Sequence, residues 1–454
     1  MESELTHSKL NMASYGFAKF LNEFIEMAFT AWCFFFYEQV LGLETFWVGI
    51  GYIIFALWNA VNDPLMGFLT NRPFKFTRKW GRRFPWIIIG GVPYILSYTI
   101  IFAPPGSEPL ILFLWLIFST CLFDTFNSIF FINYVSLFPD KFRSVKERRT
   151  ATAVQTPIGI IGIALGALIP PMIIDDTAPG TFIYQAVLMA VIGLVVIVLA
   201  IPGCREDRET IDLYLKKERE KTPFFQLLKT ALSQKSFLVF IITYSLYRCL
   251  VISFQASIPY LVDFVLLEDE IIVTILSAAF LLGSFASSPL WVRLARKSNN
   301  NKRAMLISAI LLIIFTLVLA FIDNWMIMFV GIIFWGIGLG GFWTMISPVL
   351  ADVIDEAVVT TQSRQEGIYN GFLQFFGRLG ILFQALTFSI IHIFTGFVEG
   401  ALVQDAPAII GIKLHFSVIP AIVMLIGTIV FWKFYNLTPD KVKDHQERVI
   451  ELKL

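Results

Sequence analysis

The strongest constraint on this chain is a series of long, nearly uninterrupted apolar segments. Twelve such segments are separated by Gly, Pro and clusters of charge, and each is long enough as a helix to cross a hydrocarbon layer of about 30 Å at about 1.5 Å per residue. Of the 454 residues, 57% are hydrophobic and only 15% are charged, against about 25% charged in soluble proteins. The sequence therefore predicts an all-α integral membrane protein.

The predicted spans fall into two groups of six. They cover residues 12–41, 45–70, 84–103, 110–138, 150–174, 181–201, 236–267, 270–293, 303–322, 325–350, 365–397 and 411–435. We expect an N-terminal six-helix bundle at 1–202, a cytoplasmic linker at 203–235, a second six-helix bundle at 236–435 and a tail at 436–454. The linker contains both signs of charge and some apolar residues, so short amphipathic helices on the membrane surface and a solvated connection remain alternatives.

The basic residues predict the orientation of the spans. The loops after the second and fourth spans are rich in Lys and Arg, whereas the loops after spans one, three, five, seven and nine contain none. Because basic loops stay on the cytoplasmic side, we expect both termini in the cytoplasm and the chain in the cell membrane. The basic residues are dispersed and the net charge is +1, so no nucleic-acid partner is expected.

The second span carries a polar face. Asn59, Asn62 and Asp63 lie at helical offsets of three and four, so they share one side of the helix. A charge inside the hydrocarbon costs at least about 2.5 kcal/mol, which favours a functional role for Asp63 as part of a cation site. A hydrogen bond from Asp63 to a neighbouring helix is the alternative.

Other polar groups lie at comparable depth in the remaining spans. Span one presents Asn22, Glu23 and Glu26, and span four presents Asp124, Asn127 and Ser128. The second half contributes basic and polar side chains, namely Arg248, Trp343, Gln374 and Arg378. An interhelical pair that only locks the bundle is the alternative for Asp124 and Glu26, whereas Glu23 and Arg378 are interpreted as functional.

Two histidines and the catalytic motifs of enzymes are relevant here, because either could indicate proton transfer or catalysis. His392 and His415 lie towards the outer ends of the last two spans, where we expect hydrogen-bonded histidines and not a proton relay. The chain contains no H-E-x-x-H, no G-x-S-x-G and no phosphate-binding glycine loop. The sequence therefore predicts that the protein is not an enzyme.

Several motifs resemble those of the glycoside–pentoside–hexuronide:cation symporters. They are Ser14-Tyr15-Gly16-Phe17, Asn62-Asp63-Pro64-Leu65-Met66-Gly67, Gly81-Arg82-Arg83-Phe84-Pro85-Trp86, Ala351-Asp352-Val353-Ile354-Asp355 and Arg364-Gln365-Glu366-Gly367. The resemblance runs from about residue 10 to residue 435. It implies a major-facilitator fold with two six-helix bundles and transport by alternating access.

The resemblance to the melibiose permeases also implies a cation site. Their cation-site asparagine, second aspartate and hydroxyl fall on Asn62, Asp63 and Ser128, but their first aspartate falls on Asn59. One carboxylate is therefore absent from the pattern. We expect such a site to hold Na⁺ weakly unless Glu23 contributes.

The same resemblance implies a solute site. The sugar-binding aspartate of span one falls on Glu23, the tryptophan of span ten on Trp343 and the lysine of span eleven on Arg378. Two further sugar contacts fall on Phe131 and Thr156 and are lost, which argues against a galactoside. Because eukaryotic sodium-dependent lysolipid symporters share the motifs, an amphiphilic substrate remains an alternative.

The sequence therefore predicts cation-coupled symport of a small polar solute: a sugar, a glycoside or a uronate. The alternatives are a sodium-dependent lysolipid symporter and a non-transporting membrane sensor. We expect a monomer with no cofactor beyond the coupling ion, Na⁺ or H⁺. The expected cation ligands are Asp63, Asn59, Asn62 and Ser128, and the expected solute ligands are Glu23, Arg378, Trp343, Arg248, Asp124 and Gln374. Charge pairs between the bundles are expected to form a cytoplasmic gate from Arg82, Arg83, Arg148, Arg149, Asp352, Asp355 and Arg364.

Overall fold

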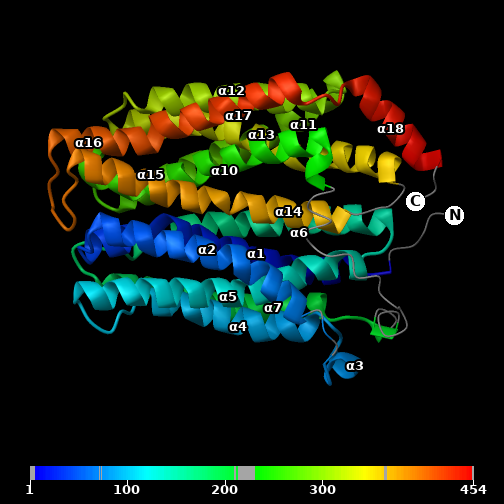
Figure 1. The fold of residues 1–454 in the computed structure, drawn as a ribbon, viewed down its shortest axis with the longest axis horizontal. Coiled ribbons are helices and arrows are strands. Elements are labelled where there is room, and N and C mark those ends of the chain that lie inside the picture. Colours follow the sequence, from blue (N-terminus) through cyan, green and yellow to red (C-terminus); the bar gives the residue numbers. More distant parts are fainter. Residues whose placement is uncertain are drawn as a thin grey trace. The chain divides into compact units, whose positions relative to one another are not determined.

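The computed structural model of the chain describes residues 6–70, 72, 74–208, 211–212, 231–361 and 366–451. Within these ranges, the structure describes the backbone but not the side chains at 64, 145, 146, 149, 366–368, 370 and 450. All regular elements in the described ranges are helices (Figure 1). They form two compact units, Met1–Lys221 with Val398–Leu402, and Thr222–Phe397 with Val403–Leu454. The main division thus falls inside the predicted linker, most of which lies outside the described residues.

Unit 1 contains the helices of the first half of the chain. They are α1 (Lys9–Phe35), η1 (Phe36–Val40), α2 (Thr45–Thr70), α3 (Thr77–Trp80), α4 (Phe84–Ile101), α5 (Pro109–Lys141), α6 (Val145–Leu168), η2 (Pro170–Met172) and α7 (Gly180–Cys204). Helix α1 packs against α6 and α7, α4 packs against α5 and α7, and α2 packs against α5. Ser8 caps the first turn of α1 and Ser144 caps that of α6, because their hydroxyls accept the N–H groups of Asn11 and Glu147.

Unit 2 contains the helices of the second half. They are α10 (Lys235–Leu261), η3 (Val262–Leu266), α11 (Ile271–Ser298), α12 (Asn301–Leu319), α13 (Trp325–Thr361), α14 (Glu366–Gly377), α15 (Leu379–Thr395), α16 (Ala406–Lys413), η4 (Leu414–Val418), α17 (Ile419–Phe434) and α18 (Pro439–Glu451). Helix α13 packs against α11 and α12, and α10 packs against α15 and α17. The C-terminal helix α18 packs against α13.

Eleven helical segments in the described ranges are long and apolar enough to cross a membrane. The predicted first span corresponds to α1, which is not among these eleven. Its 27 residues include Asn22, Glu23 and Glu26 and are therefore less apolar. Several helices continue past the predicted ends of their spans. Helix α13 runs to Thr361, whereas the predicted span ends at residue 350. The prediction follows the apolar run, and the charged turns after that run are also helical.

The eleventh predicted span corresponds to Gly371–Thr395, which crosses one irregular turn. Helix α14 ends at Gly377 and α15 begins at Leu379, with Arg378 in a turn between them. The Arg378 N–H donates to the Phe375 carbonyl at 3.3 Å and the Arg378 carbonyl accepts from Ile381 at 3.0 Å, so both bonds span three residues instead of four. The helix is therefore interrupted in the middle of an apolar segment, a feature typical of binding sites in transporters.

Helices α1 and α7 approach each other closely at a serine and a glycine. The Ser14 hydroxyl donates to the Leu199 carbonyl at 2.6 Å and accepts the Gly203 N–H at 2.8 Å. A Cβ atom at Gly203 would collide with the Tyr15 backbone. Only glycine permits this contact, which holds the first helix of unit 1 against the last.

Among the described residues, three helices contain a wide π turn. The turns are η1, η3 and η4, and each places a titratable side chain in the wide turn: Glu38, Asp263 and His415. Glu38 is fully buried and accepts the Thr45 hydroxyl at 2.6 Å. Turns of this kind interrupt the regular hydrogen-bond ladder and are frequent at functional positions.

Candidate functional site

A buried polar cluster lies between α2 and α5 of unit 1. The Asn59 amide donates to Asp124 Oδ1 at 2.5 Å. The Asn62 amide donates to Asp124 Oδ2 and to Ser128 Oγ, both at 2.9 Å, and the Ser128 hydroxyl donates to Asp63 Oδ1 at 2.5 Å. The structure therefore brings together all four residues that the sequence predicts as cation ligands.

Asp124 belongs to this cluster, although the sequence assigned it to solute binding. Its side chain is only 4% exposed and accepts hydrogen bonds from both asparagines of α2. The cluster therefore has two carboxylates, Asp63 and Asp124. The expectation of weak Na⁺ binding, which counted Asp63 and the help of Glu23 but not Asp124, stays a prediction.

The oxygen of the Asn62 side chain is the most informative atom in the cluster. Asn62 is fully buried, and its NH₂ group makes all of its side-chain hydrogen bonds, whereas its Oδ1 has no hydrogen-bond partner among the described residues. A buried polar atom without a partner costs about 1 to 3 kcal/mol, so it calls for an explanation. An amide oxygen beside two carboxylates and a hydroxyl is an oxygen-rich ligand set of the kind that hard cations prefer.

A second polar contact joins α5 to α1. The Asn127 amide donates to Asn22 Oδ1 at 3.1 Å and to Glu26 Oε1 at 3.2 Å. Glu26 therefore makes the interhelical hydrogen bond that the sequence gave as one alternative. Glu23, one residue after Asn22, is half-buried on α1.

The two intramembrane arginines of unit 2 meet at the interruption between α14 and α15. Arg248 Nε on α10 lies 3.5 Å from the Gly377 carbonyl, next to Arg378. Both arginines are half-buried, while Trp343 on α13 is 36% exposed and Gln374 on α14 is exposed. The Arg248 side chain thus lies near the start of α15, which Arg378 directly precedes, and the positive end of the helix dipole there also favours negative charge.

Most of the residues predicted to form a gate have partners within their own unit. Arg149 and Arg364 lie outside the described side chains, and Asp355 is half-buried on α13. The other members contact the following groups: Arg82 to Asp140 at 2.9 Å, Arg83 to Asn133 at 3.0 Å, Arg148 to the Phe142 carbonyl at 2.8 Å, and Asp352 to Asn301 at 2.9 Å. Charge pairs between the bundles stay a prediction.

Asp352 also borders a polar cavity of about 100 Å³ in unit 2. The cavity lies between α18 and the turn that joins α11 to α12, and its lining includes Asn300, Lys302 and Lys443. Lys302 donates to the Trp432 and Tyr435 carbonyls at 3.1 Å and 2.6 Å. These contacts tie the end of α17 to the start of α12.

Two histidines of unit 2, His392 and His415, form a buried hydrogen-bonded chain. The Ser257 hydroxyl donates to the Ser253 carbonyl at 2.7 Å, so its oxygen accepts from His415 Nδ1, also at 2.7 Å. His415 Nε2 then accepts from His392 Nε2 at 3.1 Å. Both histidines are therefore hydrogen-bonded, as the sequence predicts.

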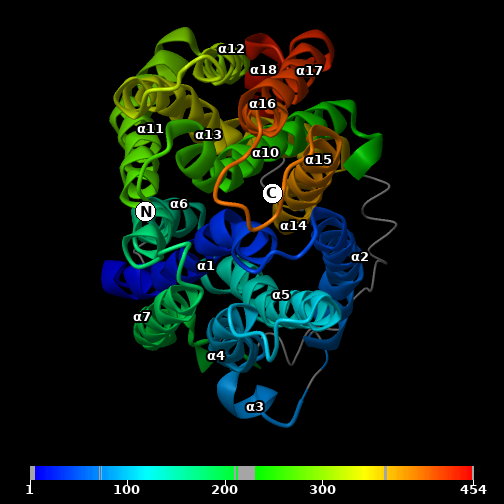
Figure 2. The same cartoon turned by 90° about the vertical axis from the view of Figure 1, so that its left-hand side faces the viewer.

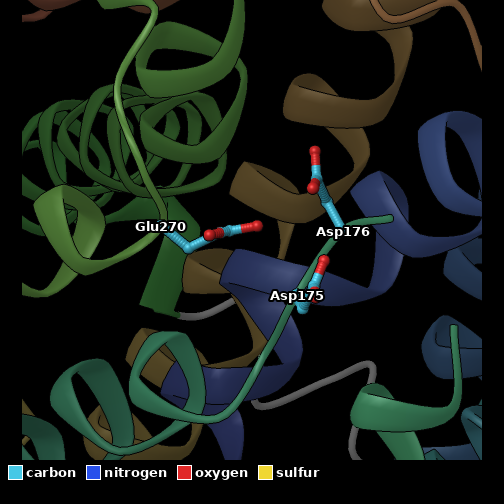
Figure 3. A group of neighbouring side chains, drawn as sticks. All are labelled: Asp175, Asp176 and Glu270. Atoms are coloured by element: carbon cyan, nitrogen blue, oxygen red, sulfur yellow. The ribbon is translucent and has the colours of Figure 1, made fainter. Parts of the chain in front are cut away.

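Three acidic residues outside the clusters described above are drawn in Figure 3. Asp175 and Asp176 lie in the loop between η2 and α7 of unit 1, and Glu270 precedes α11 of unit 2. Asp175 accepts the Thr177 N–H at 3.0 Å and the Thr177 hydroxyl at 2.5 Å. Grouped acidic residues are common on protein surfaces, and we assign no metal site to these three.

Asp124 makes the interhelical contact that the sequence gave as one alternative, but the sequence did not place it among the cation-site residues. The spacing indicated that Asp124 accompanies the predicted cation ligand Ser128, because residues four apart share a helix face. What the sequence did not contain is the pairing of that face with Asn59 and Asn62 of α2. This pairing depends on the packing of α2 against α5.

A family model described as MFS/sugar transport protein matches residues 14–439 of the chain. Sodium-dependent lysophosphatidylcholine symporter 1 of Gallus gallus is 24% identical over 460 residues, which cover 91% of this chain and 84% of that protein. The glucuronide carrier protein homolog of Escherichia coli (strain K12) is 22% identical, with coverages of 90% and 88%. The isoprimeverose transporter of Lactiplantibacillus pentosus is 21% identical, with coverages of 96% and 91%.

The fold is similar to the crystal structure of the nucleoside transporter NupG. The TM-score is 0.61, and the match covers 95% of this chain and 99% of that chain at 13% sequence identity. At this identity the likeness concerns the fold alone.

Proposed function

Because the chain belongs to the MFS/sugar transport protein family, we propose that it is a cation-coupled symporter that carries a small polar solute by alternating access. Membership confirms the predicted resemblance and major-facilitator fold, and it identifies a multi-pass membrane transporter and not an enzyme. The observation that carries the proposal of cation coupling is the buried cluster of α2 and α5, in which Asn62 Oδ1 has no hydrogen-bond partner among the described residues.

In this proposal the coupling ion binds Asp63, Asn62 and Ser128, with Asn59 and Asp124 completing the site. The ion gives Asn62 Oδ1 a partner and offsets the repulsion between the two carboxylates. Both effects exist only when the ion is bound, so binding favours the conformation in which α2 and α5 present these groups together. Coupling requires that the solute favour the same conformation.

Uptake measurements in proteoliposomes test the proposal directly. We expect concentrative uptake of a radiolabelled uronate or glycoside when an inward Na⁺ gradient is imposed, and uptake only to equilibrium when the gradient is absent. A matched inward proton gradient without Na⁺ identifies the alternative coupling ion. Failure of both gradients to drive any member of a sugar, uronate and lysolipid panel would contradict the proposal and favour a sensor.

The solute site of this proposal uses residues of both bundles. Glu23 accepts hydrogen bonds from hydroxyl groups, Trp343 packs against an apolar face of the solute, and Gln374 supplies further hydrogen bonds. Arg378 and Arg248 provide positive charge for a carboxylate, because a guanidinium inside the membrane requires an anionic partner. The name of the Escherichia coli glucuronide carrier protein homolog supports an anionic sugar.

Replacing Arg378 by Lys tests the proposed recognition of an anion. Lysine keeps the positive charge but loses the planar, two-pronged donor, so Arg378→Lys should weaken uronate binding by about tenfold and binding of a matched neutral sugar by less than about threefold. Isothermal titration of the wild type and the variant with both ligands gives the comparison. Equal losses for the two ligands would rule out direct recognition of the carboxylate by Arg378.

A lysolipid is the second candidate solute. Its support comes from relatives named as sodium-dependent lysophosphatidylcholine symporters, which are 24% identical in Gallus gallus and in Mus musculus. A lysolipid presents a phosphate, which the same two arginines would bind. Uptake of each labelled solute separates the candidates, because a lysolipid symporter would accumulate labelled lysolipid under an inward Na⁺ gradient and would not accumulate labelled uronate.

A further inference from the structure

A loop rich in basic and aromatic residues follows the polar span of unit 1. Between residues 72 and 86 the sequence contains six basic residues and no acidic one. Arg82 and Arg83 are buried and bind Asp140 and Asn133. The other four basic side chains are exposed, and in the part of the chain that the structure describes none of them has an ion-pair partner; they are Arg72, Lys75, Arg78 and Lys79.

Exposed aromatic rings lie among these cations. Phe74 is 39% and Trp80 is 45% exposed. The Phe74 ring stacks on Phe76 at a centroid distance of 5.3 Å, and both rings contact Trp86 edge to face. The Lys79 ammonium lies 5.4 Å from the centroid of Trp80. Basic groups combined with exposed Trp and Phe are the composition of segments that lie at the membrane–water interface.

The position of the loop agrees with this composition. It joins α2 to α4, which are both long and apolar enough to cross a membrane, so it lies where two spans leave the hydrocarbon. Figures 1 and 2 both draw α3 outside the packed helices of unit 1, near the start of α4. The exposed rings and cations are therefore placed at the depth of lipid headgroups.

The loop is firmly attached to unit 1. Gly81 has a φ of +92°, and a Cβ atom there would collide with the Glu206 carboxylate. That carboxylate accepts the N–H groups of Arg83 at 2.7 Å and Phe84 at 3.1 Å. Burial raises the pKa of the Glu206 carboxyl, and the two backbone donors oppose this shift. The segment 74–80 is thus held at one end by a specific turn.

We propose that the segment formed by Arg72 and residues 74–80 is a binding surface for anionic phospholipid headgroups of the membrane in which the protein lies. The four exposed cations supply the charge complementarity, and Phe74 and Trp80 insert their rings among the headgroups. Each basic residue near an anionic surface strengthens attachment by about fivefold. This inference does not depend on the identity of the transported solute.

The test uses the full-length protein in mixed micelles that contain phosphatidylcholine and phosphatidylglycerol in equal amounts. Native mass spectrometry counts the phosphatidylglycerol molecules retained by the wild type and by Arg72→Gln/Lys75→Gln/Arg78→Gln/Lys79→Gln. The matched control is Arg293→Gln/Arg296→Gln/Lys297→Gln/Arg303→Gln. It removes four exposed cations of unit 2 beside a buried tryptophan, Trp291.

We expect the loop variant to retain phosphatidylglycerol with at least about tenfold lower affinity, because each of the four removed cations contributes up to about fivefold, and the control variant to differ from the wild type by less than about twofold. Phe74→Ser/Trp80→Ser, which keeps every charge, should lie between them. If the fourfold loop variant does not fold, Arg72→Gln/Lys75→Gln provides the same comparison. Equal losses in loop and control variants, or displacement of the lipid by an equal concentration of inorganic phosphate, would overturn the proposal.

Discussion

Replacing Asp63 by Asn is expected to abolish ion-driven accumulation of the solute while leaving the protein folded. The substitution keeps the shape of the side chain, but it removes a carboxylate that accepts the Ser128 hydroxyl at 2.5 Å beside Asn62. Loss of one charged partner in a buried site costs about 3 kcal/mol, which is about 100-fold in ion affinity. At physiological ion concentrations the site would then remain empty.

Two measurements distinguish this loss from a failure to fold. Uptake into proteoliposomes under an inward Na⁺ gradient reports accumulation, and solute exchange without a gradient reports that the carrier still operates. The matched control is Asp175→Asn, which changes an exposed carboxylate of the same unit and should accumulate solute as the wild type does. Full concentrative uptake by Asp63→Asn would remove this residue from the proposed ion site.

Removing the second carboxylate should have an equally large effect, and moving it to the neighbouring side chain should reverse most of that effect. Asp124→Asn is expected to lower ion affinity by about 100-fold for the same electrostatic reason. Asn59 Nδ2 lies 2.5 Å from Asp124 Oδ1, so Asn59→Asp combined with Asp124→Asn exchanges the two side chains and keeps the charge of the cluster. The double variant should recover to within about tenfold of the wild type.

The shift in melting temperature caused by added Na⁺ measures this effect. If Asp124 only bridges α2 and α5, its replacement lowers the melting temperature but leaves the Na⁺-induced shift unchanged. A double variant that responds to Na⁺ no better than Asp124→Asn alone would show that the position of the carboxylate, and not its charge, determines binding. The first result would contradict a shared ion site, and the second would contradict the predicted rescue by exchange of the two side chains.

The sequence predicted which residues share a helix face at this site better than it predicted which faces of two helices meet. Apolar runs located the spans, and the offsets of three and four placed Asn59, Asn62 and Asp63 on one face, because both signals are local to a helix. The contact of Asp124 with that face is tertiary, since it joins residues 65 positions apart. Nothing local to α5 distinguishes a group that faces α2 from one that faces a solute.

The interruption at Arg378 was missed for a related reason. The segment 365–397 contains no proline, and Gly377 by itself does not end a helix in an apolar run. The group near the Gly377 carbonyl is Arg248 of another helix, at 3.5 Å. A sequence pattern that describes one helix at a time contains no information about this contact.

The three π turns determine what happens to these helices when one residue is deleted. A π turn holds one residue more than an α turn, so each is equivalent to a single-residue insertion that the helix has absorbed. Deleting one residue restores the regular register and rotates the following part of the helix by about 100° relative to the part before it. Glu38 would then lose its alignment with Thr45, and His415 its alignment with Ser257 and His392. The inserted residue is therefore what directs these polar side chains to their partners, and a shorter helix of the same composition would present other side chains there.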